Sequence, residues 1–181
     1  MGPYQTEKDY IQDLLLHGMY STAREDLVFK GGTALSKFYY SDRFSEDIDF
    51  TYRDTTESAA KIDFESTLSE ALKSIAYETE YKQKPKINEF GTIEAVLSVG
   101  GPRFNGRRDT VQYVRIEASI RGSVILAPKP LSRAPVYADA PNYVALVMDK
   151  AEMLAEKIRA ILSRGRLHKE RDLYDICFFA F

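Results

Sequence analysis

The chain has 181 residues, enough for one domain with a substantial core or for a core with a small appendage. Apolar residues make up 44% and charged residues 29% of the sequence, which is typical of a soluble globular protein. No apolar run approaches the roughly 20 residues that span a bilayer, and the first residues lack a signal-peptide pattern, so we expect no membrane partner. The net charge of −2 excludes a generally basic protein, so any nucleic acid must bind to a local patch.

Cysteine and histidine are scarce in the sequence. The single cysteine, Cys177, excludes an internal disulfide and fits a reducing cytoplasm, where we expect the protein to act. Because Cys177 stands in the apolar run 176–179, we interpret it as a core residue. The two histidines, His17 and His168, are too few for a zinc site of histidine and cysteine, and we interpret both as surface or helix-end residues.

The predicted elements alternate helix and strand in the first half of the chain. Apolar residues spaced by three and four over 10–15 predict a first helix that begins near Thr6. The next predicted elements, in chain order, are a strand at 27–29, a helix at 33–40, a strand at 47–50 with an apolar period of two, and a helix at 57–76.

The second half begins with two strands, at 92–99 and 111–120, which a glycine-rich loop joins as a hairpin. The stretch 127–141 holds four prolines and is predicted to be irregular. From Met148 the pattern is helical, with one break at Gly165 and a last helix near His168.

These elements predict an α+β fold in which a mixed β-sheet is flanked by helices. We assign residues 1–147 to the core and residues 148–181 to a C-terminal helical segment that completes the active site. The apolar end at 178–181 is expected either to pack back on the core or to belong to a helical domain that is cut short.

Asp47 and Asp49 are the central feature of the sequence. On a strand, residues i and i+2 point to one face, with Cα atoms about 6.5–7 Å apart. Two adjacent carboxylates repel each other unless a cation lies between them, and Mg²⁺ prefers oxygen ligands. Glu117 would join this edge if its strand lies beside theirs, as a third metal ligand or as a general base. A solvent-facing strand position is the alternative for Glu117, since acids are common on surfaces.

Gly31, Gly32 and Thr33 lie between a predicted strand and a predicted helix. Small residues there let backbone N–H groups approach a phosphate, the helix N-terminus adds positive charge, and the Thr33 hydroxyl can donate to a phosphate oxygen. A Gly-Gly pair alone is more often a simple turn. The order strand, Gly-Gly-Thr, helix, acidic strand is what indicates a phosphate site beside a metal site.

Basic residues recur in the C-terminal segment. Lys150, Lys157 and Arg164 are spaced by seven residues, so they share one helix face that can neutralise a triphosphate. A solvated basic face is the alternative interpretation. Arg171 and Asp175 stand four residues apart and can pair, so a purely structural salt bridge is the alternative interpretation of this last helix.

Segments 29–37 (FKGGTALSK) and 43–50 (RFSEDIDF) resemble the AbiEii-type nucleotidyltransferases. That family includes the MenT-type toxins and belongs to the DNA polymerase β-like superfamily. A second block, 152–160 (EMLAEKIRA) followed by 171–176 (RDLYDI), resembles the family's lysine helix and its Arg-Asp-x-x-Asp helix. The superfamily turn is often Gly-Ser, whereas this chain has Gly-Gly-Thr, which this branch also uses.

The resemblance implies a nucleotidyltransferase fold and Mg²⁺-dependent transfer of a nucleotide from an NTP, with Mn²⁺ as the alternative ion. It implies an RNA acceptor, typically the tRNA acceptor end, and a cognate antitoxin protein that neutralises the toxin. It also implies that Asp47 and Asp49 bind the metal, with Glu117 as the third acid, and that Lys157 and either Asp172 or Asp175 complete the catalytic site. The residues implied to contact the nucleotide are Gly32, Thr33, Lys37, Arg43, Ser45 and Lys157.

The acceptor surface is less well marked in the sequence. The candidate basic patch consists of Lys82, Lys84, Lys86, Arg103, Arg107 and Arg108, for which solvated loop charge is the simpler interpretation. Tyr39, Tyr40, Tyr52 and Tyr113 are candidates for stacking on a base, although half-buried structural positions are the simpler interpretation. Two other functions stay open: nucleotidyl transfer to a protein or a small molecule such as an antibiotic, and a non-catalytic nucleotide- or RNA-binding module with a relic site.

Overall fold

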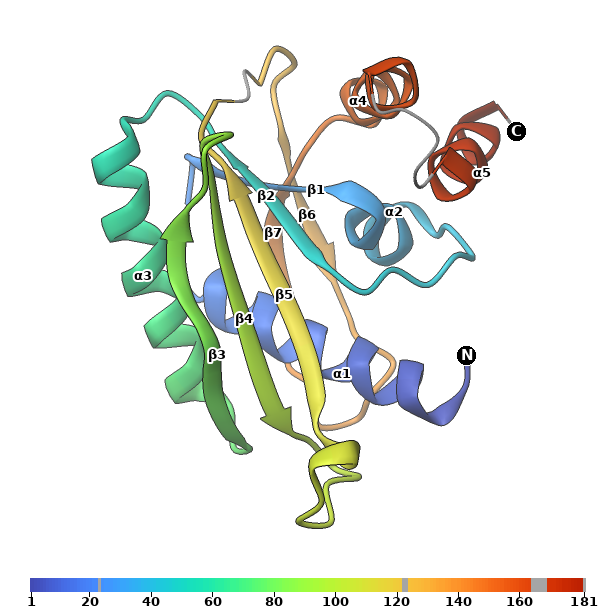
Figure 1. Ribbon diagram of the computed structural model, residues 1–181. Helices are drawn as coiled ribbons and strands as arrows, with labels where there is room; N and C mark the ends of the chain where they lie inside the picture. Colours follow the sequence, from blue (N-terminus) through green and yellow to red (C-terminus); the bar gives the residue numbers. More distant parts are fainter. Residues whose placement is uncertain (23, 122–123, 164–168, 181) are drawn as a thin grey trace.

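The computed structural model describes residues 1–22, 24–121, 124–163 and 169–180 (Figure 1). Its helices are α1 (Pro3–Met19), α2 (Gly31–Tyr39), α3 (Glu57–Ser74), the short 3₁₀ helix η1 (Arg108–Thr110), α4 (Lys150–Ser163) and α5 (Lys169–Ala180). Its strands are β1 (Leu27–Lys30), β2 (Ile48–Tyr52), β3 (Glu78–Ile87), β4 (Thr92–Gly100), β5 (Gln112–Ser119), β6 (Lys129–Arg133) and β7 (Tyr143–Val147). None of the described helices is long and apolar enough to cross a membrane.

The described strands form one mixed sheet in the order β3-β4-β5-β2-β1-β7-β6. β2 runs parallel to β5, and β1 runs parallel to β7, whereas the other neighbouring pairs are antiparallel. This arrangement confirms the predicted α+β fold with a mixed sheet. It also places β2, which follows Asp47, between β5 and β1 in the middle of the sheet, where its backbone pairs with a strand on each side.

The core lies between the sheet and the helices that cover it. α1 packs against α3, β5 and β7, and α2 packs against β1, β2 and β6. In Figure 1, α1 runs behind the sheet, while the front of β3, β4 and β5 carries no described helix over its lower half. Ile11, Phe29, Phe50 and Leu97 are fully or almost fully buried in this core. Burial of one such side chain stabilises the fold by roughly 1.5–3 kcal/mol, so the core holds the central strands rigidly.

Several element boundaries differ from the predictions. The first helix begins at Pro3 rather than near Thr6, because proline suits the first helical position and Gly2 caps the helix. Strand β2 begins at Ile48, so Asp47 stands just before the strand instead of within it. Within α3, the apolar side chain of Ile62 is 70% exposed and lies outside the core.

The sequence prediction missed three strands. β3 alternates charged residues with partly buried ones and lies at an edge of the sheet, so it lacks the apolar period that marks a half-buried strand. β6 lies within the stretch predicted to be irregular, and it tolerates Pro130 because it forms the other edge. β7 has only five residues, and it lies between the stretch predicted to be irregular and the predicted helix from Met148, where the sequence predicts no element.

The C-terminal end packs back on the core in part. Phe179 contacts the core, and the Lys150 ammonium lies 5.0 Å and 5.3 Å from the ring centres of Phe178 and Phe179. Cys177 is exposed, so its interpretation as a core residue is wrong. Asp175 and Phe179, four residues apart, take the inward side of α5, and the helical period turns Cys177 outward between them.

The structure describes one of the two histidines. His17 is half-buried in the last turn of α1, as expected of a helix-end residue. His168 and Arg164 lie outside the described residues.

Candidate active site

The three acids predicted from the sequence lie together near the middle of the sheet, where β2 and β5 are neighbours. Because β2 and β5 are parallel neighbours, Asp49 lies directly opposite Glu117 in the strand register. Asp47 stands two residues before Asp49, at the entrance to β2. The sequence left open whether the strand of Glu117 lies beside the strand of Asp49. In the fold these two strands are neighbours.

The carboxyl groups of Asp49 and Glu117 have raised pKa values. Burial, followed by repulsion from Glu117 and Asp47, raises the pKa of Asp49 from 3.8 to about 7, although Lys30 and Lys157 act in the opposite direction. Burial is also the main cause that raises the pKa of Glu117. Among the described residues, the one side-chain hydrogen bond to either aspartate is donated by the Thr33 hydroxyl to the backbone carbonyl of Asp47, so no donor reaches their carboxylate oxygens to offset this cost.

These residues fit a divalent cation in their chemistry. They supply the hard oxygen ligands that Mg²⁺ prefers, and a cation between them would relieve their mutual repulsion. Among the described residues, no three such side chains already converge in the geometry of a finished metal site. The fit is consistent with the way Mg²⁺ binds in nucleotide enzymes, where one or two carboxylates act together with substrate phosphates.

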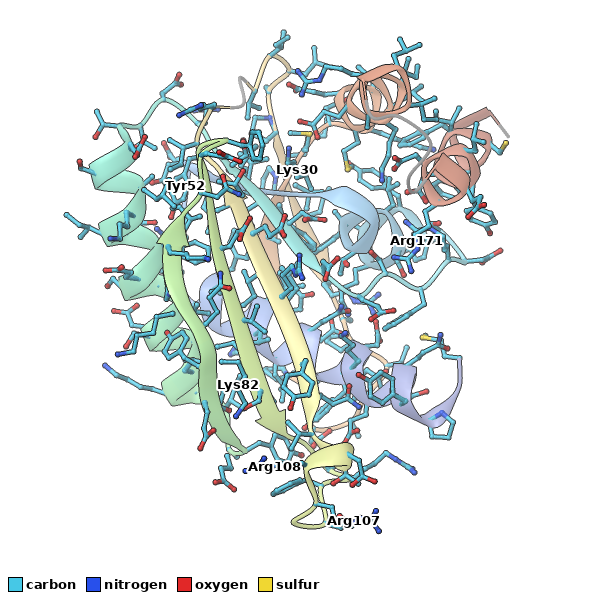
Figure 2. All side chains as sticks on the ribbon, viewed as in Figure 1. Lys30, Tyr52, Lys82, Arg107, Arg108 and Arg171 are labelled. Atoms are coloured by element: carbon cyan, nitrogen blue, oxygen red, sulfur yellow. The ribbon has the colours of Figure 1, made fainter. Side chains whose placement is uncertain are left out.

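A cavity of about 640 Å³ opens over the carboxylates. Its acidic lining residues are Asp47, Asp49, Glu117, Glu156 and Asp172, and its basic ones are Lys30, Arg43, Arg115, Lys157, Arg159 and Arg171. In Figure 2, Lys30 lies beside β1 and β2, and Arg171 lies on α5. Basic groups from both the sheet and the C-terminal helices thus surround the carboxylates. This is the charge pattern that a bound triphosphate requires.

The Gly31-Gly32 turn lies against the acidic strand. Gly31 has φ +79°, and a Cβ atom there would come within 2.9 Å of Cβ and Cγ of Asp49. A Cβ atom at Gly32 would come within 2.6 Å of an Arg43 guanidinium nitrogen and 2.7 Å of the Ser45 hydroxyl oxygen. Only glycine fits both positions without a shift of the neighbours. The first turn of α2 therefore opens on the cavity together with the loop that carries Arg43 and Ser45.

Two residues expected to contact the nucleotide point elsewhere. Thr33 is 1% exposed, and its hydroxyl donates to the backbone carbonyl of Asp47. The Lys37 ammonium lies 2.8 Å from the Asp9 carboxylate and 3.1 Å from the Asp13 carboxylate, in the protein interior. Neither residue lines the cavity, so the predicted nucleotide contacts of these two side chains are wrong. Thr33 and Lys37 stand one turn apart, so both side chains point to the buried side of α2.

The C-terminal block reaches the site through ion pairs. The Lys157 ammonium lies 2.8 Å from Asp172 and 2.9 Å from Asp175. Burial by itself would lower the pKa of Lys157, but the hydrogen bonds to these two carboxylates raise it overall. Asp175 also receives two hydrogen bonds from the Arg43 guanidinium. The pairing of Arg171 with Asp175 that their spacing allows is therefore replaced by a network that joins α4, α5 and the loop before β2.

The predicted basic stripe divides between two environments. Lys157 lines the cavity, whereas Lys150 packs over the phenylalanine rings at the end of α5. Residues seven apart share a face, but they lie about 10 Å apart along the helix axis. Only one of the two described lysines can therefore serve the site.

The sequence prediction missed several lining residues. Lys30 belongs to the quoted motif but was not assigned to the site, and its ammonium lies 2.8 Å from Glu156. Arg115 precedes Glu117 by two residues, so the strand period marks it for the same face. Arg171 and Arg159 line the cavity from α5 and α4, and a single sequence held no signal for which side of those helices faces the sheet.

A family comparison decides the assignment. The model of the nucleotidyl transferase AbiEii toxin family, of type IV toxin–antitoxin systems, matches residues 13–180. This chain belongs to the AbiEii family. The match includes the turn, the acidic strand and both C-terminal helices, so it covers every part of the cavity described above.

Solved structures share the AbiEii fold of this chain. The nucleotidyltransferase toxin MenT4 of Mycobacterium tuberculosis H37Rv is 24% identical with a TM-score of 0.69, over 98% of this chain and 59% of MenT4. JHP933 from Helicobacter pylori is 17% identical with a TM-score of 0.64, over 99% of this chain and 67% of JHP933. The chain thus spans about 59% of the length of MenT4, and at these identities the likeness is one of fold. No match was found among curated proteins.

Proposed function

We propose that this AbiEii-family chain is a Mg²⁺-dependent nucleotidyltransferase that moves a nucleoside monophosphate from an NTP to RNA, with tRNA the favoured acceptor. The observation that carries this proposal is the register of Asp49 opposite Glu117, inside a cavity that six basic residues line. Paired acids beside a glycine turn and a basic rim are the parts that in-line phosphoryl chemistry requires.

In the proposed reaction, the acceptor hydroxyl oxygen forms a bond to the α-phosphorus of the NTP. The bond from that phosphorus to the oxygen bridging the β-phosphate breaks, and pyrophosphate leaves. Mg²⁺, or Mn²⁺ in its place, would be held by Asp47 and Asp49 with Glu117 beside them, and when bound it neutralises charge on the phosphates. Glu117 is half-buried with a raised pKa, which suits a carboxylate that accepts the hydroxyl proton.

The basic rim would hold the triphosphate. The backbone N–H groups at Gly31 and Gly32 open on the cavity at the start of α2 and suit an anionic ligand. Lys157 supplies a cation from α4, and its ion pairs with Asp172 and Asp175 fix its position. Arg171 makes no ion pair with another described residue, so it is available to a phosphate oxygen.

The biological setting follows from the family. AbiEii toxins belong to type IV toxin–antitoxin systems, so we propose a cognate antitoxin protein as the partner and the cytoplasm as the site of action. The exposed thiol of Cys177 is compatible with a reducing compartment.

The test is incubation of the protein with each labelled NTP, Mg²⁺, and either purified tRNA or lysate protein. We expect labelled tRNA from the wild-type chain and none from Asp49→Asn. Asp54→Asn is the matched control, since the Asp54 side chain is 89% exposed and lies outside the cavity. If a protein or a small molecule becomes labelled and the RNA does not, that molecule is the acceptor and RNA is not. Absence of any labelled product would favour a nucleotide-binding module without activity.

A further inference from the structure

A second cavity, of about 420 Å³, opens on the same sheet at the far end of β4 and β5. Tyr113 of β5 and Phe104 of the hairpin loop contribute two aromatic rings to its lining. Phe104 packs over Gly100, where a Cβ atom would come within 2.8 Å of the ring. Glycine at this position therefore lets the Phe104 ring lie close to the strand.

One strand connects the two cavities. Along β5, Tyr113, Arg115 and Glu117 point to the face that the described helices leave open, while the residues between them are buried. Arg115 and Glu117 line the active-site cavity, and Tyr113 lines the second one. Four residues of extended strand separate Tyr113 from Glu117, which corresponds to about 13 Å. That distance exceeds the spacing between neighbouring nucleotides. An RNA whose end reacts beside Glu117 would therefore place an upstream nucleotide near Tyr113.

The charges of the second cavity favour a base over a phosphate. Lys82 and Arg108 line it, but so do Glu78 and Glu80, and the Lys82 ammonium lies 3.1 Å from the Glu80 carboxylate. The lining is therefore close to neutral, and two carboxylates would repel a phosphate. An aromatic ring that is 45% exposed, as Tyr113 is, offers instead a stacking surface for any base.

This cavity also divides the basic patch that was predicted for the acceptor. Arg108 lines the cavity, whereas Arg107 forms an ion pair with Asp109 and does not line it. Figure 2 shows Lys82 on β3 and Arg108 at the base of the hairpin loop, with Arg107 farther out at its tip. The two neighbouring arginines are thus not equivalent.

We propose that the second cavity is a subsite for a nucleobase of a single-stranded RNA acceptor, stacked on Tyr113, one or more nucleotides upstream of the hydroxyl that reacts beside Glu117. This inference rests on the proposed function. It adds that the single-stranded RNA crosses the open face of β5 between the two cavities. The Arg115 guanidinium then lies beside the RNA backbone. A single strand is required because base stacking on a side chain needs an unpaired base.

The first experiment measures binding of a short fluorescein-labelled single-stranded RNA by anisotropy, so it does not depend on catalysis. Tyr113→Ala is expected to weaken binding by roughly 10-fold to 100-fold, because an aromatic side chain that stacks on a base contributes that much. Tyr113→Phe keeps the ring and should bind like the wild type. Tyr40→Ala is the control, because Tyr40 is exposed and lies outside both cavities.

The second experiment separates the two arginines and the two cavities. Arg108→Glu should weaken RNA binding several-fold more than Arg107→Glu, while both variants and Tyr113→Ala should bind NTP like the wild type. Unchanged RNA binding by Tyr113→Ala, equal losses in Tyr113→Phe and Tyr113→Ala, or no binding of single-stranded RNA by the wild type would each overturn the inference. If RNA binds as expected but no acceptor is labelled, the proposed function fails and the subsite stands.

Discussion

Arg43 and Asp175 form a two-pronged ion pair, with Nε to Oδ1 at 2.9 Å and Nη2 to Oδ2 at 2.8 Å. Arg43 lies in the loop that leads to Asp47 and Asp49, and Asp175 lies on α5 near the other end of the chain. The pair therefore fixes the C-terminal helices to the active-site loop. Asp175 is 1% exposed, so removal of either partner would leave a buried charge without its counter-charge.

The first prediction concerns that contact. Asp175→Ala leaves the Arg43 guanidinium and the Lys157 ammonium without their shared carboxylate, so it should lower the free energy of unfolding by roughly 1.5–3 kcal/mol. Arg171→Ala, four residues away on the exposed side of α5, should change it by no more than about 0.5 kcal/mol. Chemical denaturation of both variants provides the measurement. Equal stabilities of the two would show that the pair does not anchor α5.

The same carboxylate has a predictable pH dependence. Burial would raise the pKa of Asp175, but hydrogen bonds from Arg43 and Lys157 hold it below its usual 3.8. A lowered folded-state pKa contributes stability that is present above the unfolded-state pKa and is lost as the pH falls through the folded-state value. Melting temperatures of the wild type and Asp175→Asn should therefore differ most near neutral pH and converge as the pH falls below 3.8. A constant difference over that range contradicts the assignment.

The carboxylates of Asp47 and Asp49 are expected to support activity, and their mutual repulsion is expected to lower the stability of the fold. Asp47→Asn and Asp49→Asn should each lower nucleotidyl transfer by more than about 100-fold, because loss of a metal ligand removes several kcal/mol of charge stabilisation. Asp49→Asn should also melt at a higher temperature than the wild type in the presence of a chelator, since it removes one of three mutually repelling carboxylates. Near-wild-type turnover in either variant would sink the metal-ligand assignment.

Gly31→Ala tests the approach of the turn to the acidic strand. The new Cβ atom would collide with the Asp49 side chain at a backbone angle that disfavours alanine, so we expect a loss of at least about 1 kcal/mol together with most of the activity. Gly91→Ala is the matched control, since Gly91 also has a positive φ but its neighbour is the flexible Arg121 side chain. That variant should lose stability and keep NTP binding. Calorimetric NTP titration of both variants separates the two effects.

Lys157→Ala should weaken NTP binding by roughly 10-fold, in line with the loss of one charge-assisted hydrogen bond. It should also cost about 1 kcal/mol of stability, because Asp172 loses its partner while Asp175 keeps Arg43. Lys150→Ala is the comparison, since Lys150 shares the helix face but lies over phenylalanine rings outside the cavity. If Lys150→Ala weakens NTP binding as much as Lys157→Ala does, the cavity assignment is wrong.

Local patterns in the sequence were enough to single out residues that line the cavity. The two-residue period around Asp47 and Asp49, and the position of Gly31 and Gly32 before a helix, depend only on backbone geometry within a few residues. The same reasoning predicted a mixed sheet and the strand that carries Glu117. The resemblance to AbiEii-type proteins, which the family match confirms, rested on these short segments and on the two C-terminal helices.

Only the tertiary structure decided which polar side chains serve the site. Lys37 and Lys157 look alike in the sequence, yet Lys37 neutralises buried carboxylates of α1 and Lys157 lines the cavity. Arg171 and Asp175 have the spacing of a local pair, but the Arg43 guanidinium, distant in sequence, takes Asp175 because its planar fork matches both oxygens in a buried position. Long charged side chains reach several partners from one backbone position, so their roles depend on which elements the fold brings within a few ångströms.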